Sequence, residues 1–86
     1  MPGMDPTHAP TPDDYPTWIN DRIRAELKRL RLELGLSAYA LAIPKKLTAQ
    51  TIRNIEKGTH SPSIITLGLL CVRLGTTVKA VVDAAG

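Results

Sequence analysis

The chain has 86 residues, which is enough for one domain with a small hydrophobic core. Hydrophobic residues make up 43%, but there is no Phe, so Leu, Ile, Val and Ala must build the core. We expect no membrane association, because no apolar run reaches about 18 residues, and no signal peptide, because the start lacks a basic region followed by an apolar stretch. The single cysteine, Cys71, excludes an intrachain disulfide and favours a cytoplasmic protein.

The net charge of +3 is distributed unevenly along the chain. Residues 1–16 contain three acidic residues and no Lys or Arg, whereas residues 17–86 contain all eleven basic residues and five acidic ones, which leaves +6. A compact basic domain favours a polyanionic partner, although many proteins are basic for solubility alone. Because five of the seven prolines also lie in residues 1–16, we predict an extended or disordered arm there, followed by a single domain over 17–86.

The first predicted helix begins with Thr17 as its N-cap and stops at Gly35. Its apolar residues recur at spacings of three and four, which places them on one helical stripe: Ile19, Ile23, Leu27, Leu30 and Leu34. Basic residues occupy the other faces of this helix.

Four shorter helices are predicted after it, each from a capping Ser or Thr, an apolar run and a closing Gly or Pro. They cover residues 38–43 after Ser37, 49–57 after Thr48, 64–74 after Ser63, and 78–85 after Thr76 or Thr77. Pro44 limits the first of these, and Gly58 and Gly75 close the next two. With no internal repeat and no strand-like alternation, the predicted fold is all-α, a compact bundle of five helices.

The predicted helix over 49–57 has two unlike sides. Ile52 and Ile55 share one side, and the other side is polar, with Thr48, Ala49, Gln50, Arg53, Asn54 and Lys57. This division predicts a helix that packs on a core and presents its polar side to a partner or, as in any small bundle, only to water.

Several motifs stand at consistent spacing through the middle of the chain. They are GLS before the second helix, LA at its end, TxxTIxxIExG over 48–58, SPSIxTL over 61–67 and LG at 74–75. With these motifs, residues 19–82 resemble the helix-turn-helix domain of phage repressor and Cro-like proteins, the XRE family. The resemblance implies a repressor-like bundle, with the helix-turn-helix at the second and third helices, and a transcriptional regulator that binds double-stranded DNA.

In this kind of domain the second helix of the motif enters the major groove with its N-terminal residues at base edges. Gln and Asn can pair with adenine, Arg with guanine, and Ala or Thr can touch a thymine methyl. The resemblance therefore implies base reading by Ala49, Gln50, Arg53 and Asn54. It implies DNA backbone contacts from Ser37, Tyr39, Lys45, Lys46, Thr48, Thr51, Lys57 and His60. The basic residues of the first helix, Arg22, Arg24, Lys28 and Arg29, are further candidates for phosphate contacts.

The resemblance also implies an internal ion pair between Arg31 and Glu56, which joins the first helix to the end of the third. Three positions depart from the family pattern. Ala38 stands where Gln is frequent, Lys46 stands where the turn usually has Gly, and Pro44 lies in the expected last turn of the second helix. A left-handed conformation at Lys46 would cost roughly 1 kcal/mol, so we expect a turn of different shape.

The helix over 64–74 is apolar nearly all round. Its predicted core stripe is Ile64, Leu67, Leu70, Cys71 and Leu74, and a second apolar stripe stands where the family is usually polar. We predict that this second stripe is a homodimer interface, formed by Ile65, Leu69, Val72 and Thr76. The alternative is that the protein's own arm covers it, with Tyr15 and Trp18.

Two other function classes compete with the DNA-binding regulator. The same fold can act as an antitoxin-like or adaptor module that binds a protein such as a toxin. For an enzyme, the sequence offers only His8 and His60, with no Cys–His, Ser–His or paired-carboxylate arrangement. We therefore expect no catalytic site, and we expect no metal and no cofactor, because neither metal-ligand spacing nor a Gly-rich phosphate loop is present.

Overall fold

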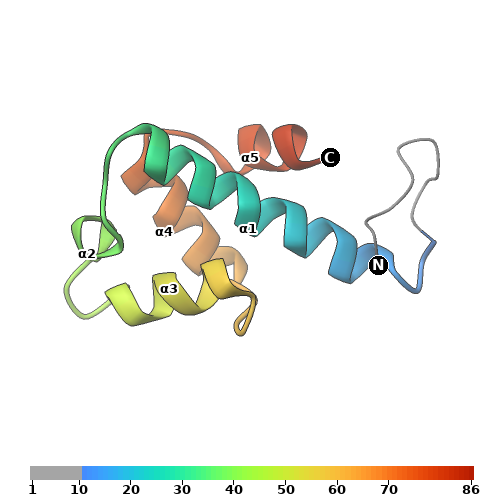
Figure 1. Cartoon of the computed structure of the whole chain (residues 1–86), viewed down its shortest axis with the longest axis horizontal. Helices are drawn as coiled ribbons and strands as arrows, with labels where there is room; N and C mark the ends of the chain where they lie inside the picture. Colours follow the sequence, from blue (N-terminus) through green and yellow to red (C-terminus); the bar gives the residue numbers. More distant parts are fainter. Residues whose placement is uncertain (1–10) are drawn as a thin grey trace.

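A computed structural model describes residues 11–86, which form five helices. In chain order they are α1 (Tyr15–Glu33), α2 (Ala38–Leu41), α3 (Ala49–Lys57), α4 (Ile64–Leu74) and α5 (Val78–Ala85). Figure 1 shows α1 running the length of the molecule, with the other helices gathered along the part that leads into α2. The all-α prediction is confirmed. No single described helix is long and apolar enough to span a membrane, and α4 and α5 meet that criterion only together, as a pair bent by 96°.

The core is aliphatic, as the lack of Phe requires. It lies between all five helices, and its buried side chains are Leu27, Ala38, Leu41, Leu47, Ile52, Ile55, Leu67, Leu70, Cys71, Leu74 and Val81. Burial raises the pKa of the Cys71 thiol, which keeps it protonated at neutral pH.

Side-chain caps start four of the five helices. Ser37, Thr48, Ser63 and Thr77 each accept a hydrogen bond from the backbone N–H three residues further on. Of the two threonines proposed for α5, Thr77 is the cap. The helices α3 and α4 end at Gly58 and Gly75, which both adopt left-handed backbone conformations.

The start of α1 differs from the prediction. The helix begins at Tyr15, inside the predicted arm, so the N-cap assigned to Thr17 is wrong. Pro16 is compatible with the first helical turn because the N–H that proline lacks has no partner within the helix there. Residues 1–10 of the predicted arm lie outside the described residues.

The connection between α2 and α3 also differs. The helix α2 ends at Leu41, two residues earlier than predicted, because a residue before proline disfavours helical backbone and Ile43 precedes Pro44. Ile43 and Leu47 instead exchange backbone hydrogen bonds of 2.7 and 2.9 Å around a tight turn. Lys46, which stands where the family usually has Gly, does not have a positive φ; the residue that does is Lys45, at 66°, so the turn has a different shape, as expected.

Two predictions about α4 need correction. Ile64, assigned to the core, is 69% exposed, whereas Leu69, assigned to the second stripe, is partly buried against the core. The outward apolar side chains are therefore Ile64, Ile65 and Val72. Tyr15 and Trp18 do not cover them. Both residues belong to α1, where their ring centroids lie 5.9 Å apart with the rings tilted by 32°.

Candidate nucleic-acid interface

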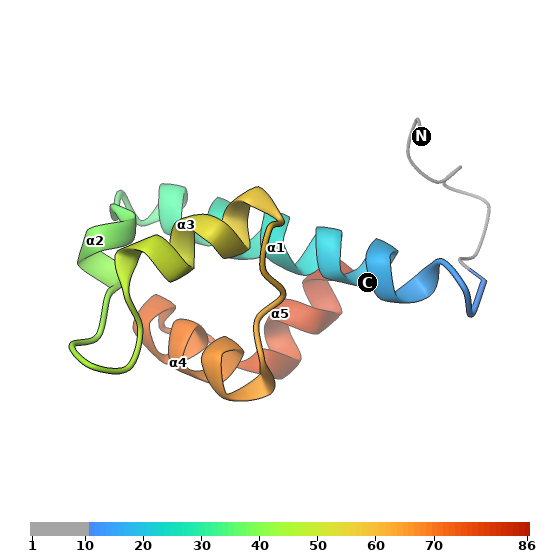
Figure 2. The same cartoon turned by 90° about the horizontal axis from the view of Figure 1, so that it is seen from below.

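The helix α3 follows α2 through the tight turn and lies on the outside of the bundle (Figure 2). Its two isoleucines, Ile52 and Ile55, are each only 1% exposed and fix the orientation of the helix on the core. As a result Gln50 and Arg53 point to solvent, while Ala49, in contact with the core, and Asn54 are partly buried.

An internal hydrogen bond orders part of this polar side. Gln50 Nε2 donates to Asn54 Oδ1 at 3.0 Å, one helical turn away. The carbonyl oxygen of Gln50 and its second N–H stay available, which is the donor–acceptor pair that an amide uses on adenine. The two amides on the outer side of α3 are thus coupled.

The side chains expected at the DNA backbone surround α3. Tyr39, Lys45, Lys46, Lys57 and His60 are all exposed. The hydroxyls of Ser37 and Thr48 accept the capping N–H groups of α2 and α3, and Thr51 Oγ1 lies 2.8 Å from that of Thr48. The cap hydroxyls therefore order the starts of both helices of the motif.

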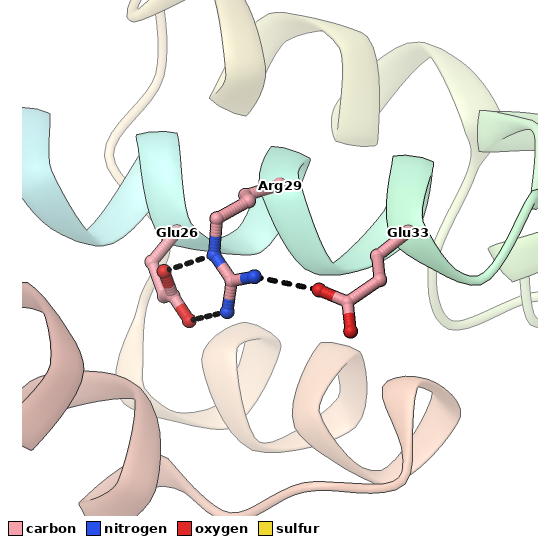
Figure 3. A network of polar contacts seen from close by, with 3 residues as sticks. All are labelled: Glu26, Arg29 and Glu33. Carbon is pink, nitrogen blue, oxygen red and sulfur yellow. Dashed lines mark hydrogen bonds and ion pairs between the residues drawn. The ribbon is translucent and has the colours of Figure 1, made fainter.

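The basic side chains of α1 are largely engaged within the protein. Arg29 lies between two carboxylates, with bonds of 2.8 and 2.7 Å to Glu26 and 2.6 Å to Glu33 (Figure 3). The hydrogen bonds from Arg29 hold the pKa of Glu26 below its ordinary value. Arg24 pairs with Asp21 at 3.1 Å, and Arg22 donates to the carbonyl of Ala85. These three arginines thus have partners within the protein, and phosphate contacts from them stay a prediction.

The basic side chains on α3 and in the turn before it, in contrast, make no contacts of this kind with described residues. Within residues 11–86, the side chains of Lys45, Lys46, Arg53 and Lys57 make no hydrogen bond or ion pair to protein, and on α1 only Lys28 shares that state. The single carboxylate on α3, Glu56, is neutralised by an arginine of α1. Uncompensated positive charge is thus concentrated on α3 and the turn before it.

Arg31 and Glu56 form a two-pronged ion pair. Arg31 Nε and Nη2 donate to the two carboxylate oxygens of Glu56 at 2.7 and 2.9 Å, and Nη1 donates to the carbonyl of Leu36 at 2.8 Å. The side chains are 14% and 11% exposed, so the pair is mostly shielded from water. The hydrogen bonds to Glu56 raise the pKa of Arg31. One guanidinium thereby links α1, the loop after it and α3.

Two further arginines hold the motif in place, and sequence reasoning missed both. Arg24 Nη1 donates to the carbonyl of Glu56 at 3.2 Å, and Arg73 Nη2 donates to that of Ala40 at 2.8 Å. These bonds satisfy carbonyls near the C-terminal ends of α3 and α2. No local sequence pattern predicts these two hydrogen bonds, since each connects residues more than thirty positions apart.

Two short helices, a tight turn and an exposed polar second helix define a helix-turn-helix domain. A family model described as Helix-turn-helix matches residues 27–80, more than half of the chain. The chain belongs to this family, the Cro- and cI-like XRE group, and is a DNA-binding protein of the transcription-regulator kind. No curated protein matches the chain in sequence. In the described part of the chain, no three His, Cys, Asp or Glu side chains come together as a metal site would require.

Proposed function

We propose that the protein regulates transcription by reading a specific operator with α3 in the major groove. The observation that supports this most directly is the outer side of α3, where Gln50 and Arg53 are exposed beside cations with no partner in the described protein. Arginine is suited to guanine and the Gln50 amide to adenine. Asn54 contributes through its hydrogen bond to Gln50 as well as by its own remaining donors.

Phosphate contacts in this proposal come from the two sides of α3. Lys45 and Lys46 precede the helix, Lys57 ends it, and Tyr39 is 78% exposed on α2. Contacts of this kind position a protein on DNA and make its affinity depend on salt, but they carry no sequence information. Sequence choice is left to the side chains at the start and middle of α3.

We further propose that the protein acts as a homodimer on a palindromic site. One recognition helix reads only a few base pairs, whereas a two-fold dimer places two of them about 34–36 Å apart, one turn of DNA. The exposed apolar side of α4 supports such pairing. Because Leu69 packs partly on the core, Ile64, Ile65 and Val72 replace the predicted stripe as its outer residues.

The test is selection of a binding site from random duplexes, followed by affinity measurements at several salt concentrations. We expect a palindromic consensus, bound about a thousandfold or more tightly than a scrambled duplex at the same salt. Equal affinity for the two duplexes would reject operator reading. It would then favour the antitoxin-like or adaptor role, in which the same fold binds a protein and needs no base preference.

A further inference from the structure

Gly68, in the middle of α4, has no role within the described chain that requires glycine. Gly68 lies inside the helix α4 and does not have a positive φ, unlike Gly35, Gly58 and Gly75. A methyl group added at its Cα would have no atom within 4 Å other than those of its chain neighbours and of the helix's own backbone. Glycine is nevertheless among the residues least favourable to a helix interior. The position therefore points to something outside the single chain that comes close to the α4 backbone.

The side chains on either side of Gly68 along the helix face are apolar and exposed. Ile64 lies one turn before it and Val72 one turn after it, and these side chains are 69% and 74% exposed. Because residues four apart stack on the same face of a helix, Gly68 forms a gap between two outward apolar side chains. We call Ile64, Gly68 and Val72 the α4 notch.

We propose that a second copy of this chain lays its own α4 across the α4 notch, antiparallel, with the two-fold axis near Gly68. The inference rests on the proposed homodimer and specifies its contact. A two-fold interface must be self-complementary. In the antiparallel crossing Ile64 packs on Val72 of the second copy and Val72 packs on its Ile64, while the absence of a Cβ at both glycines lets the two backbones approach.

The described structure favours a second copy over other occupants. No charged residue stands between Pro62 and Arg73, so the face offers nothing to a charged partner but matches its own apolar composition. The aromatic residues at the start of α1 are engaged elsewhere. Trp18 stacks on Tyr15 and lies 4.9 Å from the guanidinium carbon of Arg22, which donates to α5 at Ala85.

The first experiment uses Gly68→Ala, for which the α4 notch predicts effects of opposite sign on folding and on association. In the wild-type background, the added methyl should weaken dimerisation about tenfold or more, measured by sedimentation equilibrium without DNA. In a chain made monomeric by Val72→Glu, Gly68→Ala should instead raise the melting temperature by several degrees, since alanine is the better helix former. The matched control is Leu32→Ala, which removes an exposed apolar side chain from α1 and should leave dimerisation unchanged.

The second experiment tests the antiparallel register. Ile64→Lys and Val72→Glu should each give a folded monomer with unchanged helical content. Mixing the two monomeric variants should restore a dimer, because the crossing then pairs the introduced lysine of one chain with the introduced glutamate of the other. On the opposite side of the two-fold axis, Val72 of the first chain still packs on Ile64 of the second. Failure of the mixture to dimerise would overturn the register.

Undiminished dimerisation of Gly68→Ala, or a wild-type chain that stays monomeric at tens of micromolar, would overturn the α4 notch itself. Because both experiments omit DNA, a chain that dimerises as described but shows no base preference would reject the proposed operator reading alone. Base preference together with a failed notch would reject only this inference.

Discussion

The helix α1 and the segment from the turn through α3 are both rich in basic residues, but they differ in what those residues contact. On α1, Arg22, Arg24, Arg29 and Arg31 bond to carboxylates or carbonyls of the protein itself. On α3 and its turn, the basic side chains have no such partner within residues 11–86, and the one carboxylate is neutralised from α1.

This difference shows that counting charges along a sequence does not locate the positive surface. The basic residues of α1 first suggested phosphate contacts, yet Arg22 and Arg24 bond to other helices of the fold, and Arg29 bonds to carboxylates of its own helix. Arg31 serves both regions, because it neutralises the carboxylate of Glu56 on α3 and links that helix to α1. A folding role of α1 and the proposed DNA-binding role of α3 can be tested separately.

The largest effect is expected from breaking the link between the two regions. Glu56→Ala leaves the Arg31 guanidinium mostly buried without its carboxylate, which should cost about 3 kcal/mol of folding free energy. For a domain of this size that lowers the melting temperature by more than about 10 °C, as thermal unfolding followed by circular dichroism would measure.

The matched control for Glu56→Ala is Asp83→Ala, which breaks the exposed pair between Lys79 and Asp83 on α5. An exposed pair of this kind contributes about 0–1 kcal/mol, so the melting temperature should change little. If both variants unfold at the wild-type temperature, the pair between α1 and α3 has no structural role.

A smaller effect, confined to specific DNA, is expected on the reading side. Gln50→Ala should weaken binding to the selected operator by about 1–3 kcal/mol and should relax base preference at one position of each half-site. Binding to random DNA should change much less, and the melting temperature should stay near wild type because Gln50 is exposed. Equal losses on operator and random duplexes would contradict base reading by this residue.

The Lys and Arg residues give the most direct comparison of the two regions. Lys46→Ala should lower the magnitude of the slope of log affinity against log salt by about 0.9, the value for one phosphate contact. Arg29→Ala removes the same formal charge from α1, but Arg29 is bound to Glu26 and Glu33, so the slope should stay unchanged. Equal changes in slope for the two variants would mean that Arg29 contacts a phosphate despite its ion pairs with Glu26 and Glu33.

Much of this arrangement could be predicted from the sequence, because it depends on local physics. Cap hydroxyls, glycine stops and the inward pair Ile52 and Ile55 follow from spacing and side-chain chemistry over a few residues. The departure of the turn from the family's shape was expected from Lys46, but the bridge between Ile43 and Leu47 and the positive φ at Lys45 could not be predicted from local spacing.

Hydrogen bonds between residues distant in sequence could not be predicted from local spacing either. The resemblance implied the pairing of Arg31 with Glu56, but no spacing indicated that Arg24 and Arg73 reach carbonyls at the ends of α3 and α2. Ile64 is exposed and Leu69 is partly buried because of the way α4 is rotated about its axis on the core. In a helix that is apolar nearly all round, the spacing of apolar residues does not define that rotation.

The smallest effect concerns the pH dependence of α1. Glu26 has its pKa held below 4.5 by hydrogen bonds from Arg29, so its ionised form stabilises the fold. That contribution is complete above the unfolded pKa and is lost as the pH falls through the lower folded pKa. The melting temperature of wild type should therefore exceed that of Glu26→Gln near neutral pH, and the two curves should converge as the pH falls below 4.5. The difference should be small, because the Arg29 side chain is 56% exposed and water screens its charge, and high salt should reduce the difference further. DNA affinity at neutral pH gives the decisive second measurement. Glu26→Gln leaves Arg29 bound to Glu33, so affinity should rise only if the freed donors of Arg29 reach phosphate. We expect no rise, which would keep α1 as the structural region and α3 as the binding region.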